Sequence, residues 1–167
     1  IFEGVIAHQP SKTKIGLFFK RLARFMLPTR TIRLYERYRM WTLKKSLWLQ
    51  LFFWTCQGLG HFRFILPLIR FIDKKYSPHH FFNELFDKYH PDLIVTTDIL
   101  NENDVCLMQE AKSRKIPIIA IIRSWDNLTA HSLIRVIPDK LLVWNKILKH
   151  EAIFYSGVPE ERINLVG

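Results

Sequence analysis

The order of apolar runs in residues 91–167 constrains the fold more than any other feature of this chain. Short continuous runs rich in Ile, Leu and Val occur at 92–97, 116–122, 138–145 and 161–167. Segments with helical spacing of apolar residues separate these runs at 101–115 and 146–157, with a shorter helical segment before Ile137. This alternation with tight loops predicts an α/β fold with a parallel, doubly wound sheet. Because the runs are continuous rather than alternating, we expect strands buried on both faces.

The N-terminal half has a different character. Between residues 11 and 89 the chain is rich in Lys, Arg and aromatic residues, and prolines divide it into segments. The apolar spacing predicts helices near 13–26, 29–59 with a break allowed, 61–75 and 80–89. The first eight residues, "IFEGVIAH", predict a strand. We expect one domain over residues 1–167, in which a basic helical region at 1–90 precedes a sheet core at 91–167.

Charge is distributed unevenly between the two halves. Residues 1–90 contain 16 Lys and Arg against 5 Asp and Glu, a net charge of +11, whereas residues 91–167 contain 9 against 10. The whole positive excess therefore lies in the helical half. Such an excess favours an anionic surface or an anionic substrate as the partner of that half.

The uncharged run at 46–62 raises the question of a membrane. At 17 residues it falls short of the roughly 20 needed to span a bilayer, and it contains Gln, His and Gly. Lying on a membrane fits better, because Trp and Lys side chains occur together here, and we predict four membrane-facing residues: Trp41, Trp48, Lys44 and Lys45. The alternative is that the aromatics pack the helices against the sheet while the cations form a solvated face.

Polar and aromatic residues follow three of the predicted strands. In open parallel sheets, ligands bind beyond the carboxyl ends of the strands. We therefore predict that one edge of the sheet binds substrate through Thr97, Asp98, Arg123, Ser124, Trp125, Asn127 and Asn145. We predict Asp126 as a catalytic base, provided that Trp125 partly desolvates it. Arg123 could hold a phosphate or pair with Asp98 or Asp126, and the Asp and Asn residues have helix capping as their alternative role.

Several site classes have no support in the sequence. It contains no G-x-G-x-x-G, no P-loop and no G-x-S-x-G. No metal site is predicted, because His79 and His80 are adjacent and His131 has no ligand three or four residues away. Cys56 and Cys106 are far apart and belong to no ligand motif, which favours a reducing compartment.

Ordered motifs in residues 89–167 carry a resemblance to a known family. They are "SWDNLT" after one strand, "VWN" after the next, and "GVPEERI" before a strand that ends in Gly. With these motifs the segment resembles the later part of the N-terminal domain of bacterial GT-B glycosyltransferases, surface-polysaccharide and glycerophosphotransferase-like members above all. The helical half does not align with that family, and its first strand and the following loop are not recognisable.

The resemblance implies a Rossmann-like domain that holds the acceptor, facing a second domain that holds a nucleotide-activated donor. The chain would then be the acceptor half of a longer protein, inactive alone, with no cofactor of its own. The expected partner is a glycan or lipid-linked acceptor, and the expected location is cytoplasmic and peripheral on the inner membrane face. Two alternatives stay open: a sugar-nucleotide epimerase of the same fold, and a non-catalytic basic module that binds membrane or nucleic acid, of which nucleic acid is disfavoured.

Overall fold

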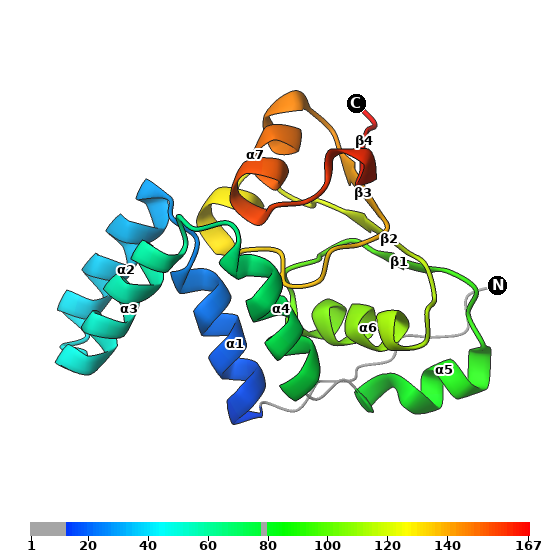
Figure 1. The fold of residues 1–167 in the computed structure, drawn as a ribbon, viewed down its shortest axis with the longest axis horizontal. Helices are drawn as coiled ribbons and strands as arrows, with labels where there is room; N and C mark the ends of the chain where they lie inside the picture. Colours follow the sequence, from blue (N-terminus) through cyan, green and yellow to red (C-terminus); the bar gives the residue numbers. More distant parts are fainter. Residues whose placement is uncertain (1–12, 78–79) are drawn as a thin grey trace.

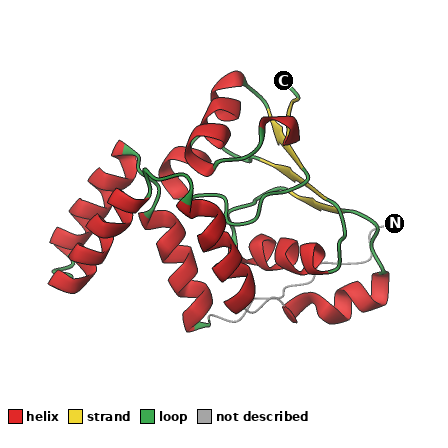
Figure 2. Cartoon of the chain, viewed as in Figure 1, coloured by secondary structure: helices red, strands yellow, loops and turns green. Residues whose placement is uncertain are grey.

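The computed structural model describes residues 13–77 and 80–167, which form an α/β fold built on a parallel sheet (Figure 1, Figure 2). The strands are β1 (Ile94–Thr96), β2 (Ile118–Ile121), β3 (Lys140–Val143) and β4 (Ile163–Leu165). They are hydrogen-bonded in the order β1-β2-β3-β4. The predicted α/β class with a parallel sheet is thus confirmed. The strand at residues 1–8 lies outside the described residues.

Helices precede the sheet and connect its strands. Before β1 come α1 (Lys14–Phe25), α2 (Arg30–Thr42), α3 (Leu47–Leu59), α4 (Ile65–Tyr76), η1 (His80–Phe82) and α5 (Asn83–Tyr89). Between and beside the strands lie α6 (Glu102–Ser113), η2 (Asn127–His131), α7 (Lys146–Ser156) and η3 (Glu160–Arg162). Each of α1, α2 and α3 begins at a Thr or Ser whose hydroxyl accepts a backbone N–H, as N-caps do.

The sheet differs from the prediction in the number of its faces that are buried. Ile118 and Ala120 in β2 are buried, but the alternate Ile119 is only partly buried and Val95 in β1 is exposed. Among the described strands the order never reverses, so successive crossovers advance in one direction and place their helices on the same face. The expectation of strands buried on both faces, wound in two directions, is therefore wrong for the part of the chain that is described.

The helical half has an apolar core of its own. Phe25, Leu27, Ile32 and Phe53 are buried together there, separate from the cluster beneath the sheet. The break allowed within residues 29–59 falls at 43–46, where α2 ends and α3 begins. These two helices lie side by side and project away from the sheet, at the left of Figure 1. We call them the α2–α3 arm, and residues 41–48 its tip.

Buried charges join the helical half to the sheet. The Arg135 guanidinium, in the segment before β3, donates to both carboxylate oxygens of Asp73 at 2.7 and 2.8 Å. It also donates to Glu102 at the start of α6 at 2.9 Å. Arg70 of α4 donates to the backbone carbonyls of Ile134 and Ser156. Both arginines thus fix α4 against the connection that follows the candidate site.

The run at 46–62 forms one helix and a turn. Its helix α3 has 13 residues and would be about 20 Å long at 1.5 Å per residue. None of the helices in the described residues is long and apolar enough to cross a bilayer.

Candidate functional site

The carboxyl ends of β1 and β2 are joined by an ion pair. The Arg123 guanidinium lies 3.3 Å from the Asp98 carboxylate. Of the two pairings expected for Arg123, the structure has the one with Asp98. Capping of α6 by Asp98 is wrong: the N-cap is Asn101, whose side-chain oxygen accepts from Asn103 N at 3.1 Å. Asp98 and Arg123 therefore sit at the sheet edge as predicted, held together rather than free.

Asp126 is held by its own segment. The Ser124 hydroxyl donates to its carboxylate at 2.5 Å, and His131 Nε2 lies 3.6 Å from the other oxygen. The carboxylate accepts no hydrogen bond from the backbone at the start of η2, so Asp126 does not cap this helix through its side chain. Donation from Ser124 holds the pKa of Asp126 below its ordinary value, with a smaller contribution from His131. A carboxylate of lowered pKa is a weak proton acceptor.

Trp125 does not supply the expected desolvation. Its side chain is 75% exposed, and the Asp126 side chain is only partly buried, at 33% exposure. The indole instead offers an apolar surface at the edge of the sheet, on which a sugar ring or another flat group could stack. The assignment of Asp126 as the base stays a prediction, but the hydrogen bond from Ser124 outweighs the partial desolvation of the carboxylate, so its pKa is lowered rather than raised.

The remaining predicted residues divide into exposed and structural ones. Thr97 is exposed just after β1. Asn127 is only 4% exposed and therefore belongs to the packed interior beneath the edge. Asn145 is the N-cap of α7, where its side-chain oxygen accepts from Leu148 N at 2.8 Å. The capping alternative is therefore the role that the structure gives to Asn145.

Asp104, in the first turns of α6, was not predicted as part of this site. Its pKa is raised to about 6, mainly by burial and also by the nearby Asp98, while Arg123 opposes the rise. A carboxyl with a pKa near neutrality is better suited to accept and release protons than Asp126. The sequence signal was present, because α6 follows β1 directly and carries acidic residues in its first turn.

The turn that carries the site is anchored to the helical half. Backbone N–H groups of Thr129 and Ala130 donate to the Asp126 carbonyl at 3.1 and 2.8 Å, at the start of η2. The Thr29 hydroxyl then donates to the Thr129 carbonyl, and Arg24 donates to the His131 carbonyl. The position of "SWDNLT" therefore depends on α1 and α2 as well as on the sheet.

The four residues predicted to face a membrane form a group that is separate from the sheet edge. Trp41, Lys44, Lys45 and Trp48 lie at the tip of the α2–α3 arm, and all four are exposed. The two indoles are each 81% exposed. Packing against the sheet, the alternative for these aromatics, is therefore wrong for Trp41 and Trp48.

Comparison with known proteins leaves the site to be interpreted from its own chemistry. No family model, curated protein or solved structure matches the chain. Within residues 13–77 and 80–167, no group of three or more His, Cys, Asp or Glu side chains is placed to hold a metal ion. The groups available for chemistry at this edge are an exposed cation, an indole and two carboxylates whose pKa values differ. They belong to Arg123, Trp125, Asp126 and Asp104.

Proposed function

We propose that this chain is the acceptor-binding half of a glycosyltransferase with two Rossmann-like domains of GT-B type. The acceptor would be a cell-surface glycan or a lipid-linked precursor, used at the cytoplasmic face of the membrane. One observation carries the proposal: side chains from the ends of β1 and β2 meet at one edge, as the pair of Asp98 with Arg123 shows. This is the edge at which open parallel sheets bind their ligands.

The residues at this edge fit the handling of a hydroxyl acceptor. Trp125 offers an exposed apolar face for a sugar ring, and Arg123 offers a guanidinium for an anionic group on the acceptor. In the transfer, the acceptor hydroxyl oxygen bonds to the donor carbon, the bond to the donor phosphate breaks, and the phosphate leaves with the electron pair. A carboxylate takes the hydroxyl proton. Asp126 is the predicted base, and Asp104, with its pKa of about 6, is the second candidate.

Binding to the chain itself tests the proposal, because the donor domain would lie elsewhere. We would titrate the chain with acidic and neutral oligosaccharides and with nucleotide sugars, using isothermal titration calorimetry. We expect oligosaccharide binding that Arg123→Gln and Trp125→Ala weaken by roughly tenfold or more each, as loss of a charge-assisted bond or an aromatic contact does. Asp92→Asn is the control, because Asp92 is exposed at the opposite, amino end of β1.

The other results would decide against this function. Binding of a nucleotide sugar that Arg123→Gln abolishes would place the donor at this edge and favour the epimerase. Failure of every oligosaccharide to bind would remove the acceptor assignment. Equal loss with Asp92→Asn would show that the effect of the edge variants is not local.

A further inference from the structure

Exposed charge on residues 13–76 of the helical half is of a single sign. Residues 13–76 contain 14 Lys and Arg but only two acidic residues, Glu36 and Asp73. Both carboxylates are buried, at 1% and 2% exposure. Glu36 pairs with Arg24, and Asp73 pairs with Arg135. The surface of this stretch therefore presents cations with no exposed carboxylate among them.

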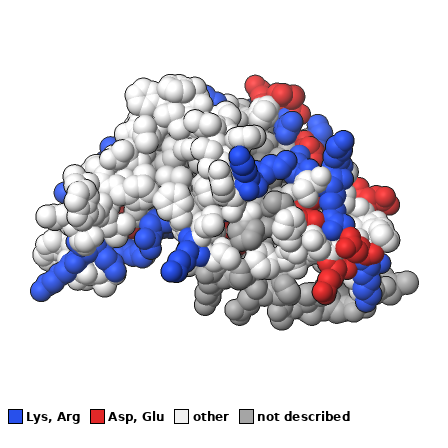
Figure 3. Space-filling model, turned by 60° about the horizontal axis from the view of Figure 1, so that its bottom comes forward, with Lys and Arg blue, Asp and Glu red and all other residues white. Residues whose placement is uncertain are grey.

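The face turned to the viewer in Figure 3 shows how these charges are arranged. Blue and white atoms cover the end of the molecule that carries the α2–α3 arm, at the left of the view. Asp and Glu side chains gather toward the other end. A partner of the arm is thus expected to be anionic, because it would meet no acidic groups there.

Large apolar side chains are exposed among the cations of the arm. At its tip, Trp41 and Trp48 flank Lys44 and Lys45, and Leu47 is 76% exposed. The arm buries its inner side through Met40 and Phe53, so these tip residues have no core to enter. Contiguous exposed apolar surface of this kind marks an interaction site rather than ordinary protein surface.

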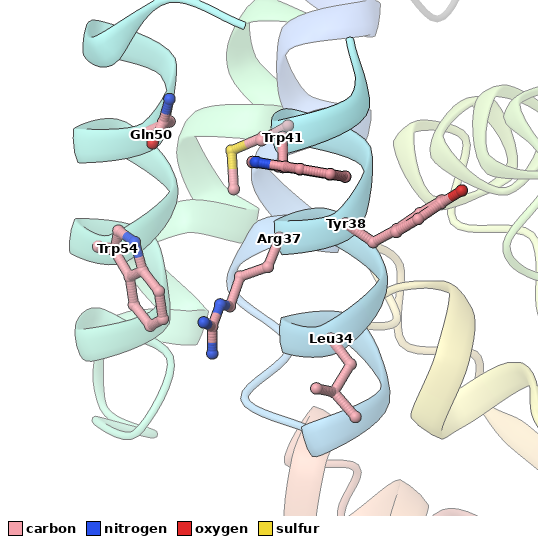
Figure 4. A pocket seen from close by; sticks show the side chains of 7 residues that line it. Leu34, Arg37, Tyr38, Trp41, Gln50 and Trp54 are labelled. Atoms are coloured by element: carbon pink, nitrogen blue, oxygen red, sulfur yellow. The ribbon is translucent and has the colours of Figure 1, made fainter. Parts of the chain in front are cut away.

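A groove runs between the two helices of the arm (Figure 4). It has a volume of about 600 Å³. It is lined by Leu34, Arg37, Tyr38, Met40, Trp41, Gln50 and Trp54. In Figure 4 the Arg37 side chain extends from α2 toward Trp54 of α3. Neither carboxylate of residues 13–76 pairs with Arg37, since both are engaged with other arginines.

We propose that the α2–α3 arm docks on an anionic lipid bilayer. Trp41 and Trp48 enter the interfacial region, where indole rings are favoured, while Lys44 and Lys45 face the anionic headgroups. Arg37 binds the phosphate of one lipid headgroup in the groove, with the indoles along its acyl side. The inference stands apart from the proposed function, because it uses none of the residues at the sheet edge.

Two other anionic or apolar partners fit the surface less well. Single-stranded nucleic acid would use the cations and the indoles, but the exposed Leu43, Leu47 and Leu51 offer no flat surface for bases. The core of a contact with a folded protein is depleted in Lys, whereas here Lys44 and Lys45 lie between the two exposed indoles. Aliphatic, aromatic and cationic side chains together match the bilayer interface.

Vesicle flotation tests the proposal with the whole chain. We expect binding to phosphatidylcholine vesicles that contain phosphatidylglycerol, weak binding to phosphatidylcholine alone, and a decrease with rising salt. Lys44→Glu with Lys45→Glu should weaken binding by roughly 25-fold or more, at about fivefold per cation lost. The matched control is Lys115→Glu with Lys140→Glu, an equal charge change on exposed lysines near the sheet, which should bind nearly as the native chain does.

Separate variants test the exposed indoles at the tip and the groove. Trp41→Ala with Trp48→Ala should weaken binding by about tenfold or more, whereas Ile147→Ala with Phe154→Ala, exposed on α7, should not. Arg37→Gln should weaken binding to the phosphatidylglycerol vesicles by about fivefold. Circular dichroism melts of every variant should match the native chain, because all these side chains are exposed.

Each outcome of these binding experiments either supports the proposal or overturns it. Equal losses in the arm variants and in their controls would overturn the proposal, because only total charge or hydrophobicity would matter. Tighter binding of oligonucleotides than of vesicles, sensitive to the same arm variants, would assign the arm to nucleic acid instead. Vesicle binding without any oligosaccharide binding would uphold this inference while removing the proposed function.

Discussion

The hydroxyl of Thr29 donates a hydrogen bond of 2.7 Å to the backbone carbonyl of Thr129, across 100 residues of sequence. The same hydroxyl accepts from Ile32 N at 3.3 Å and so caps the start of α2. One side chain therefore fixes both the base of the α2–α3 arm and the turn η2, which follows Asp126. The α2–α3 arm and the candidate site therefore meet at this point.

Thr29→Val should lower the free energy of unfolding by about 1–2 kcal/mol, because it removes an N-cap and leaves a carbonyl without its donor. Urea denaturation followed by circular dichroism measures the change. Thr31→Val, an exposed position in the first turn of α2, serves as the control and should change stability by less than about 0.5 kcal/mol. Equal effects of the two variants would mean that the Thr29 hydroxyl contributes no more to stability than an exposed hydroxyl in the first turn does.

Arg135→Met should destabilise the protein by about 3–5 kcal/mol, because it leaves the buried Asp73 carboxylate without its cation. Adding Asp73→Asn should recover part of that loss, since the uncompensated charge is then gone. Denaturant unfolding of the two single variants and the double variant measures the coupling. A double variant no more stable than Arg135→Met would show that the cost comes from lost packing instead.

The pKa of about 6 for Asp104 predicts a pH dependence of stability. Between the ordinary value of 3.8 and about 6, the folded state binds more protons at this carboxyl than the unfolded state does. Stability should therefore fall as pH rises through this window, and Asp104→Asn should reduce that slope. The carboxyl carbon shift of Asp104, followed by NMR, should titrate near pH 6. Titration near 4 would contradict the burial of this group.

Ser124→Ala should raise the pKa of Asp126, because the Ser124 hydroxyl is the main stabiliser of the ionised carboxylate. His131→Ala should raise it by less, since the imidazole makes the smaller contribution. NMR titration of the Asp126 carboxyl in the three proteins gives the order. A larger rise with His131→Ala would identify the imidazole as the partner that controls this carboxylate.

Gly60→Ala should destabilise the helical half by about 1–3 kcal/mol. A Cβ at this position would lie 1.9 Å from the carbonyl oxygen of Met26, so the backbone would have to shift. The control is Gly58→Ala, because a Cβ on Gly58 meets nothing within 4 Å and alanine favours the helix. Thermal unfolding should therefore separate the two substitutions in opposite directions.

Local sequence patterns predicted the helices and strands well where short-range interactions alone determine them. The helix expected at 101–115 is α6 at Glu102–Ser113, and the strand expected at 116–122 is β2 at Ile118–Ile121. Helical spacing and strand runs are short-range properties, which is why they could be recognised without the fold. The break between α2 and α3 was harder to place, because no proline or glycine marks residues 43–46.

The candidate site was predicted less completely than the elements. The strand ends indicated Asp98 and Arg123 correctly as neighbours, since parallel strands end at one edge. They did not indicate Asp104, whose raised pKa depends on burial and on the approach of Asp98. Nor did they indicate that Asn127 would be buried, because the depth of a side chain is set by the elements that pack over it.

The sequence by itself determined the type and order of the elements, the positive charge excess of the helical half and the residues available at the strand ends. These follow from local periodicity and from composition, which need no long-range contacts. Only the tertiary structure decided which face of the sheet is covered and which carboxylates are paired. It also decided that Trp41 and Trp48 project from an arm rather than enter the core. Those outcomes depend on contacts such as Thr29 with Thr129, between residues far apart along the chain.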